Sequence, residues 1–533
     1  MTRRIQQPVR IRARPSAVTG SGGVNLQAPP KTGSGILLAA RGTTVGQGSS
    51  SPAVVPGGDV VLRAVVSGWG QEITSTGTII GPAPLPIFAE SVGTTVVGGA
   101  SPFNTLGYHW DFGYSPAQQT ALGNWPQSGR PRWREQGRRP LAAHIYETPG
   151  TYTLSCRAQN GAGQYSDRFV TIDVRDPEVW WTTGGRTTVY ITSTTGAWPT
   201  FANNTRYILT AGADYSAKGT INIPKFAQNI VIAGSIPGGA KPTVSSVSMN
   251  VGVPTSSTPL SNILMCDINV ATDLQQQNTV NGLTFLRVTV ARIMQLVTSY
   301  DWYLVNSPTV APQYSPRNIF VQECVIDRNF YNGGAGYPVN CLTLEGENLA
   351  VLGCTIARPV EHGIRCWQGH KSLIAHCSVD GRSVDGSRHA IKHHSTGTNP
   401  WSRGPLSYGS SPNYVSRYNL CHSNRLGSPL SNDQWIVGYG PQNYAADERM
   451  EDVLVCDNWW QHGTNFYADL FGCARRMTDA GNVRSGGSIL EYNDSPHNMT
   501  VPLDWQGPYY SDYSTGVGIS PAPVLVTPNK AGT

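Results

Sequence analysis

Ionisable and polar side chains are densest between Glu345 and His394. Carboxylates, imidazoles and cations are the groups that supply general acids, general bases and charge stabilisation in enzymes. This stretch is therefore the first candidate for chemistry. The members of the cluster are Glu345, Glu347, His362, Arg365, His370, His376, Asp380, Asp385, Arg388, His389, Lys392, His393 and His394.

Paired carboxylates in this part of the chain would suit a glycoside hydrolase, which places two of them roughly 5–9.5 Å apart. The alternative is structural, because Asp often stabilises a turn by hydrogen bonding to nearby backbone. For each single Asp we expect the turn role, since the sequence fixes no distance between two of them. The candidate pairs are Asp380 with Asp385, and Asp433 with Asp457.

His389 and His393 suggest a metal site, but their spacing argues against one. On a β-strand, residues four apart share a face and lie about 13 Å from each other. That separation is too large for a shared ion unless the chain turns between them. We therefore expect these imidazoles and His394 to belong to a solvated polar face.

Aromatic side chains on loops suit sugar binding, because flat rings stack on the apolar faces of pyranoses. The alternative is that the rings fill or cap the core. In that case Trp459 and Trp460 would point to opposite sides of a strand. The candidates for substrate binding are Trp367, Trp401, Trp435 and Tyr439.

Short alternating segments recur between about Pro242 and Asn493, and they would position these residues. Segments 318–327, 348–357 and 371–380 each carry an apolar residue three before a cysteine and another two after it. The alternation has the two-residue period of strands and is bounded by Gly, Asn, Asp and Pro. Recurring strands at such intervals predict the stacked coils of a parallel β-solenoid.

The cysteines at the repeated positions are Cys324, Cys354 and Cys377, and Cys266 and Cys456 occur in a close variant of the pattern. A free cysteine behaves as a small buried hydrophobe, so we predict an internal ladder of unpaired thiols. A disulfide between stacked coils is the alternative. No Cys/His set has the spacing of a zinc site.

This stretch resembles the right-handed parallel β-helix of pectate-lyase-like enzymes and many phage tailspikes. Within it, Gly346-Glu-Asn-Leu-Ala-Val and Gly363-Ile-Arg-Cys-Trp-Gln-Gly-His resemble the coil pattern of β-helix alginate and chondroitin lyases. The resemblance implies that Arg365 aids proton delivery, that His370 assists, and that Glu345 and Glu347 bind calcium. The family's catalytic lysine does not follow Glu345, and Lys392 is the lysine kept as a catalytic candidate. No other cofactor is implied.

Four motifs lie between Gly58 and Asp176. They are Trp110-Asp-Phe-Gly, His144-Ile-Tyr, Pro149-Gly-Thr-Tyr and Asn160-Gly-Ala-Gly. Together they closely resemble the PKD domain, an immunoglobulin-like β-sandwich that usually serves as a spacer or binding module. Tyr114 stands where the family usually has a second acidic residue, which puts the family's calcium site or turn bond at this loop in question.

An arginine-rich insertion interrupts this region between Trp125 and Arg139. We expect a solvated loop, and the alternative is a contact surface for an acidic partner or a polyanionic glycan. The arginines are Arg130, Arg132, Arg134, Arg138 and Arg139.

The net charge of +6 belongs to the N-terminus. Residues 1–58 hold seven basic residues and no acidic one, which leaves 32 of the 39 basic residues against all 33 acidic ones. Residues 1–57 are also rich in Gly, Ser and Pro, so we predict an extended arm. We expect it to anchor the chain to other virion subunits. Nucleic-acid binding is not expected, because no aromatics interleave with the arginines.

The N-terminus lacks the apolar region of a secretory signal, and no apolar run is long enough to span a bilayer. This pattern favours a phage virion protein made in the host cytoplasm, without membrane insertion, over an exported enzyme. By analogy with spikes we expect a homo-oligomer, a trimer.

The sequence therefore predicts an all-β chain. Its parts are a basic arm (1–57), a PKD-like sandwich (58–176), a right-handed parallel β-helix (177–494) and a C-terminal cap or tail (495–533). The predicted function is a bacteriophage spike or fibre, such as a tailspike, tail fibre or head spike, that binds a host surface polysaccharide. The alternatives are a lyase or hydrolase acting on an acidic glycan, and a secreted bacterial surface protein.

Overall fold

The computed structural model describes residues 63–66, 72–73, 78–92, 94, 106–137, 139–159, 165–224, 226–249, 260–276, 280–296, 316–327, 340–359, 362–380, 389–395, 415–427, 435–441, 449–461, 468–472, 475–480, 482–484 and 491–493. The predicted arm (1–57) and tail (495–533) lie outside these residues. Within the described part, no helix is both long enough and apolar enough to cross a membrane.

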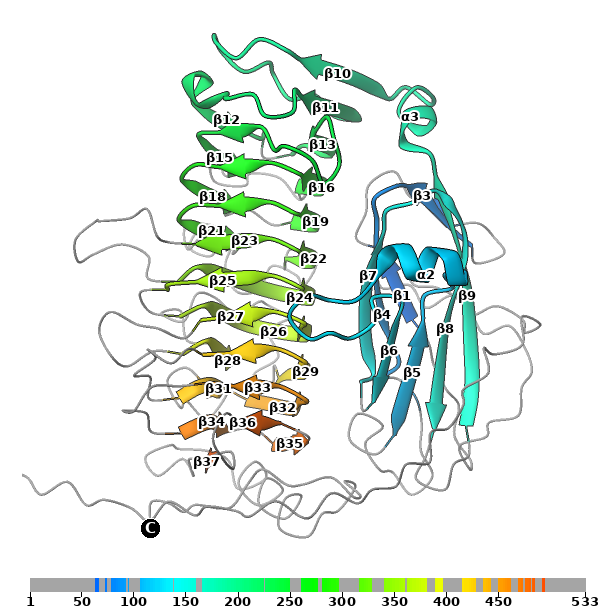
Figure 1. Cartoon of the computed structure of the whole chain (residues 1–533), viewed down its shortest axis with the longest axis vertical. Helices are drawn as coiled ribbons and strands as arrows, with labels where there is room; N and C mark the ends of the chain where they lie inside the picture. The colour runs from blue at the N-terminus through cyan, green and yellow to red at the C-terminus, as the bar shows by residue number, and fades with distance from the viewer. Residues whose placement is uncertain are drawn as a thin grey trace, which may run out of the picture.

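Two sheets packed face to face form a β-sandwich in the N-terminal part of the described chain (Figure 1). The smaller sheet is antiparallel, and in the larger sheet only the β3–β9 pair is parallel. The smaller sheet has the order β1 (Arg63–Val66), β4 (Leu85–Glu90), β7 (Leu141–Tyr146). The larger has the order β2 (Glu72–Ile73), β3 (Ile79–Pro82), β9 (Tyr165–Arg175), β8 (Gly150–Gln159), β5 (Gly107–Asp111), β6 (Arg134–Gly137).

Three of the four motifs that suggested a sandwich meet in its core, and the fourth, Asn160-Gly-Ala-Gly, lies outside the described residues. Tyr114 stacks on Tyr146 with ring centroids 5.7 Å apart, and its hydroxyl lies 2.7 Å from Nε2 of His144. The Asp111 carboxylate accepts a hydrogen bond from the backbone N–H of Gly113 at 2.7 Å, so the turn bond is present despite Tyr114. The two-sheet architecture is as predicted, and membership of the PKD family stays a prediction.

In the described part of the chain, three short helices accompany the strands. α2 (Pro116–Leu122) lies in the sandwich region and begins with a capping box at Ser115. α3 (Pro177–Trp180) follows β9 directly, with Asp176 as its N-cap. It therefore marks the predicted junction, because the first strand of the next unit starts at Thr187. The 3-10 helix η1 (Ser216–Lys218) lies in an early coil.

The remaining strands stack as a right-handed parallel β-helix with three faces, as predicted. β24 and β26 run around one corner, so the first and third faces join in a single 19-stranded sheet. The first face comprises β10 (Thr187–Ile191), β11 (Thr205–Leu209), β13 (Gln228–Gly234), β16 (Leu260–Cys266), β19 (Val280–Leu286), β22 (Arg317–Gln322), the C-terminal parts of β24 (Leu342–Leu352) and β26 (Ile364–Ala375), β29 (Val415–His422), β32 (Arg449–Cys456) and β35 (Arg475–Ala480).

The other two faces complete each coil. The second face comprises β14 (Thr243–Val244), β17 (Asn269–Val270), β20 (Thr289–Val290), β23 (Val325–Asp327), β25 (Thr355–Ala357), β27 (Ser378–Val379), β30 (Arg425–Leu426), β33 (Trp459–Trp460) and β36 (Val483–Arg484). The third comprises β12 (Thr220–Asn222), β15 (Ser246–Met249), β18 (Asp273–Gln276), β21 (Ile293–Leu296), the N-terminal parts of β24 and β26, β28 (Ile391–Ser395), β31 (Trp435–Pro441), β34 (Ala468–Gly472) and β37 (Glu491–Asn493).

Alternate side chains of each strand fill the interior, because successive residues of a strand point to opposite sides. On the first face, Ile263, Leu283 and Ile319 are register neighbours in β16, β19 and β22. All three are fully buried in one continuous core. The two-residue period of the sequence therefore decides which side chains point inward.

The corner between the first and second faces repeats a left-handed backbone conformation. The non-glycine residues at this corner have φ between 52° and 58°. A side chain adopts this conformation at some cost, so the coil geometry imposes it. Gly353 occupies the same position in its coil, with φ of 60°. We call all the residues at this corner the corner row: Asp267, Arg287, Glu323, Gly353, His376, Ser423 and Asp457.

The residue after each member of the corner row points inward and forms a ladder. The predicted cysteines Cys324, Cys354 and Cys377 occupy it and are fully buried and unpaired. Asn424 and Asn458 continue the ladder in the next two coils. The nine cysteines in the described residues are all free, as predicted.

Cys266 and Cys456 do not belong to this ladder. They lie at the ends of β16 and β32, two positions before its inward residue, and pack in the cluster beside the sandwich. Their segments have the same spacing of apolar residues but a shifted cysteine. The side of the strand on which a cysteine falls therefore decides its environment.

Replacing Asn458 by Ala should lower the free energy of unfolding by about 2–4 kcal/mol. The Asn458 amide accepts from the backbone N–H of Asn424 at 3.0 Å and donates to the carbonyl of Cys421 at 3.1 Å, so both groups would lose a partner. Urea unfolding followed by circular dichroism measures this loss. Cys377→Ala is the control, since its thiol makes only weak sulfur bonds. It accepts from the N–H of Cys354 at 3.4 Å and donates to the carbonyls of Ala375 and Val351 at 3.2 and 3.5 Å. A larger loss for that control would contradict the prediction.

The sandwich docks on the first face of the β-helix with its smaller sheet (Figure 1). Phe88 and Ile145, from the outer side of β4 and β7, share one buried cluster with Leu264, Phe320 and Leu454 of the β-helix. The rings of Phe88 and Phe320 meet edge to face at 6.4 Å. Because burying each such side chain contributes about 1.5–3 kcal/mol, this apolar contact dominates the docking.

Three arginines of the arginine-rich insertion form ion pairs with residues of the corner row. Arg132 pairs with Glu323 at 2.9 Å, and Arg130 and Arg139 both pair with Asp457, at 3.3 and 2.5 Å. The expected solvated loop is therefore wrong for these three arginines, and their acidic partner is the chain's own β-helix. Arg134 is exposed, and Arg138 lies outside the described residues.

Candidate functional site

Arg365 and Lys392, both predicted catalytic residues, lie side by side on the third face. They are register partners in the neighbouring parallel strands β26 and β28, and Thr343 of β24 pairs with Arg365 on the other side. Neighbouring strands are about 4.8 Å apart. The structure thus brings together two cations that are far apart in the sequence.

Strand alternation points both cations outward. Ile364 and Cys366, on either side of Arg365, belong to the buried core, and so does Ile391 before Lys392. Arg365 and Lys392 are half-buried. The pattern of apolar and polar residues at 364–367 and 391–394 therefore places the charged side chains on the outer surface.

Trp367 and Glu345 form the next outward row. They are register partners in β26 and β24, and the Arg365 guanidinium carbon lies 4.0 Å from the centroid of the Trp367 ring. A guanidinium over an indole face is a cation–π contact, which orients both groups. Glu345 is only 1% exposed, so its carboxylate lies deeper than the cations.

Glu347 leaves this row because the strand has a bulge at Gly346. The register of β24 and β26 shifts there, and Gly346 has φ of 122°. A Cβ on Gly346 would lie 2.0 Å from the carbonyl oxygen of Pro316, so a residue without a side chain is required. Glu347 then pairs in register with His370, at the start of the first face.

The Glu347 carboxylate forms an ion pair with a lysine, which does not fit its predicted role as a calcium ligand. Lys371 Nζ lies 3.5 Å from the Glu347 carboxylate and 3.0 Å from that of Glu90 in the sandwich. Burial alone would raise the pKa of Glu347, but Lys371, His370 and Arg317 together lower it. The calcium pair predicted from Glu345 and Glu347 is thus split between two environments.

His370 is separated from Arg365 along β26. The centroids of the His370 and Tyr418 rings are 5.8 Å apart. His370 directly precedes Lys371, on the part of β26 that belongs to the first face. Arg365 lies on the part that belongs to the third face. The predicted assistance of Arg365 by His370 does not fit this arrangement.

The Tyr439 side chain lies in the interior of the β-helix. It is fully buried, and its ring stacks on His393 with centroids 5.2 Å apart. Its predicted role in sugar binding does not fit that position. The backbone of Trp435 belongs to β31, and Trp401 lies outside the described residues, as do Asp385 and Asp433.

His393 does not belong to a solvated polar face, as was expected. It is fully buried between Tyr439 and Gly369, and burial lowers its pKa to about 3. His389 is also buried and stacks on His362 at 5.0 Å. The expectation is wrong for both, because strand alternation turns His393 inward from Lys392.

Two chemically capable residues were missed in the sequence. Glu135 and His422 meet His376 at the interface of sandwich and β-helix, and their possible ligand atoms all lie within 4.8 Å of one another. His376 was in the polar cluster without a role. Its corner position after a strand was a usable signal, whereas nothing local marked Glu135.

The third face offers charge and flat apolar surface together. Two adjacent cations match a carboxylate-bearing chain, and an indole ring matches a sugar ring. A lysine beside an arginine also has the residue types for proton abstraction next to a carboxylate. The sandwich contacts described above lie on the first face and its corners, away from this surface.

No family model matches the chain, and no curated protein matches its sequence. The solved structures that match include the following two. The A-module of the mannuronan C-5 epimerase AlgE6 of Azotobacter vinelandii is 12% identical, with 56% of this chain and 88% of that chain covered and a TM-score of 0.26. A family 28 exopolygalacturonase of Yersinia enterocolitica is 11% identical, with 78% and 88% covered and a TM-score of 0.32.

Proposed function

We propose that this chain binds an acidic polysaccharide along the outer surface of the third face of its β-helix. The observation that carries the proposal is the register pairing of Arg365 with Lys392. Trp367 lies two residues further along the strand of Arg365 and contacts its guanidinium. Carboxylates of successive uronic acid units would pair with the cations. The indole ring would support a sugar ring between them.

The surface is suited to binding a preformed, extended chain. Its side chains stand on strands of a rigid scaffold, so little conformational entropy is lost when a ligand binds. The Arg365 side chain is further fixed by its contact with Trp367. Because the cations are only half-buried, the binding should weaken as salt increases.

Replacing Arg365 by Ala should weaken binding of an acidic polysaccharide by about 10- to 100-fold, because one charge-assisted contact contributes about 1.5–3 kcal/mol. Lys392→Ala should have an effect of the same direction. Glycan arrays identify a ligand, and isothermal titration then measures the affinity of wild type and variants at low and high salt.

A matched control exists on the second face. Arg425 lies 5.0 Å over the ring of Trp459, the same type of pair as Arg365 with Trp367. Arg425→Ala should leave glycan affinity unchanged. If Arg425→Ala and Arg365→Ala weakened binding equally, the ligand would not be specific to the third face.

A lyase acting on the same polysaccharide is the second candidate function. Lys392 beside Arg365 favours it, since a base next to a cation can abstract a proton α to a carboxylate. Unsaturated product, followed by ultraviolet absorbance, would establish turnover, and Lys392→Ala should abolish it. Binding without product would leave the adhesive function alone.

The setting that we propose is a bacteriophage spike or fibre that carries this surface to a host glycan. The basic composition of residues 1–58 supports it, because such a segment suits docking to acidic neighbours. Mass spectrometry of purified particles tests the proposal. Deleting residues 1–57 should release the protein from particles without changing its glycan affinity.

A further inference from the structure

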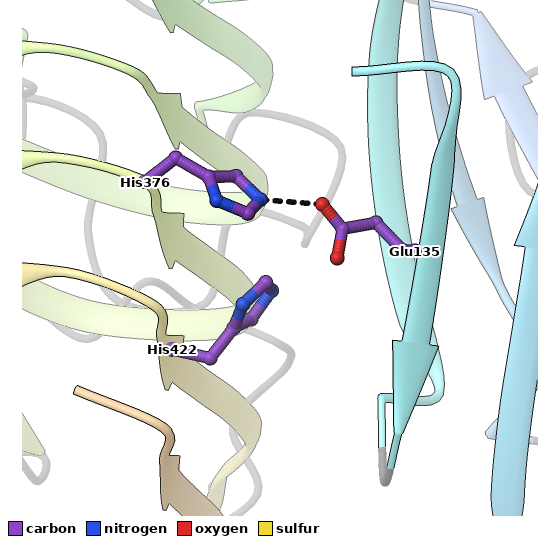
Figure 2. A group of neighbouring side chains, drawn as sticks. All are labelled: Glu135, His376 and His422. Carbon is purple, nitrogen blue, oxygen red and sulfur yellow. Dashed lines mark hydrogen bonds and ion pairs between the residues drawn. The ribbon is translucent and has the colours of Figure 1, made fainter. Parts of the chain in front are cut away.

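Three buried side chains meet where the sandwich lies on the β-helix. Glu135 comes from β6 of the sandwich, and His376 and His422 come from adjacent coils of the β-helix (Figure 2). Their possible ligand atoms all lie within 4.8 Å of one another. Among the described residues, this is the one group of three or more His, Cys, Asp or Glu side chains with that property.

The hydrogen bonds around the cluster leave the ligand atoms facing one another. Nδ1 of His376 lies 2.8 Å from the Ser128 hydroxyl, and Nδ1 of His422 lies 3.1 Å from the Ser423 hydroxyl. Each imidazole therefore keeps Nε2 for the cluster. Such bonds to the far nitrogen orient histidines in metal sites.

An unpaired nitrogen of His422 also points to a bound ligand. The side chain of His422 is fully buried, with 0% of its surface accessible to solvent. Its Nε2 atom has no hydrogen-bond partner in the structure. Nε2 of His376, in contrast, contacts the Glu135 carboxylate. Leaving a buried polar atom unpaired is unfavourable, and an ion bound between the three groups would satisfy it.

The donor set selects the class of ion. Two imidazole nitrogens and one carboxylate oxygen are typical ligands of zinc and other first-row divalent metals, whereas calcium requires mostly oxygen. Burial lowers the pKa of both His376 and His422, although Glu135 opposes it at His376. A neutral imidazole is the form that binds a metal.

The surrounding charges are balanced before any ion binds. Arg139 donates to the second oxygen of Glu135 at 2.7 Å and pairs with Asp457 at 2.5 Å. Arg130 also pairs with Asp457, at 3.3 Å. The two arginines and two carboxylates cancel, so a divalent ion brings excess positive charge.

We propose that Glu135, His376 and His422 bind one divalent transition-metal ion of the zinc class, which clamps the sandwich to the β-helix. Glu135 and His376 are 241 residues apart, so the site forms only when the two units are docked. The ion thus adds a strong link at the centre of a contact that is otherwise apolar and ionic. This inference is independent of glycan binding on the third face.

The test uses the full chain, treated with a chelator and then titrated with zinc by isothermal calorimetry. Cys473, which lies outside the described residues, is replaced by Ser in all samples so that its thiol does not compete. We expect one equivalent of zinc in the parent and at least about 100-fold weaker binding in His422→Gln. Cobalt should give the visible absorption of a four-coordinate site.

Two further variants separate the site from general effects of substitution. Glu135→Gln should also weaken zinc binding, whereas His393→Phe, which changes a buried histidine elsewhere, should not. Circular dichroism establishes that each variant is folded. The proposal is overturned if the parent binds no stoichiometric zinc, or if His422→Gln binds it as tightly as the parent.

Discussion

Replacing Arg139 by Ala should lower the free energy of unfolding by about 3–5 kcal/mol and loosen the sandwich from the β-helix. The Arg139 side chain is fully buried and bonds Glu135 of the sandwich as well as Ser423 and Asp457 of the β-helix. Its removal leaves the buried Glu135 carboxylate without its arginine. Removing one partner of a buried ion pair lowers stability more than replacing both, because it leaves a buried charge without compensation.

The charged partners of Arg139 and Glu135 shift the pKa of each group in the direction opposite to the effect of burial. Burial by itself would lower the pKa of Arg139, but Glu135 and Asp457 raise it above its ordinary value. Burial by itself would raise the pKa of Glu135, but His376 and Arg139 lower it. Each charged group is therefore stabilised by partners that belong partly to the other unit.

Urea unfolding measures the loss, and hydrogen exchange locates it. Amides of β6, β7 and β32 should exchange faster in Arg139→Ala than in the parent, because these strands line the contact. Arg134→Ala is the control, since Arg134 lies on the same strand β6 but is exposed. Equal losses for the two variants would show that Arg139 does not hold the docked arrangement.

Acid should destabilise the chain well above the range in which carboxylates titrate. Burial lowers the pKa of His393 and of His144 to about 3, from an ordinary value near 6.5. Between those values the unfolded chain binds a proton at each histidine and the folded chain does not. The free energy of unfolding therefore falls as the pH falls below about 6.5.

The expected loss at about pH 5 is about 2 kcal/mol for each of these two histidines. His393→Phe should remove one share of this pH dependence, because a similar ring would stack on Tyr439 without a titrating nitrogen. Unfolding free energies of parent and variant, measured between about pH 7.5 and pH 5, test this. Parallel curves for the two proteins would contradict the prediction.

The docked sandwich explains how one chain can carry two separate sites. It covers the first face and its corners, whereas Arg365 and Lys392 stand on the third face. The proposed metal site lies beyond the opposite end of β26, at the corner that follows Ala375. A glycan surface and a structural ion would therefore not compete for the same residues.

Local pattern alone determined the architecture. The apolar residues around Cys324, Cys354 and Cys377 recur with the two-residue period of strands, and inward positions of a solenoid must be apolar in every coil. The motifs that meet at Tyr114, Tyr146 and Asp111 likewise indicated a sandwich. Such features depend on neighbours in sequence, so they are readable without the fold.

Tertiary structure decided where the side chains act. Arg365 and Lys392 become neighbours because β26 and β28 pair in register on the third face, and a single bulge at Gly346 sends Glu347 to another face. Glu135 reaches His376 only because the sandwich folds back on the β-helix. Periodicity fixes whether a residue points in or out, but loop lengths and docking set its partners, and no local pattern encodes these.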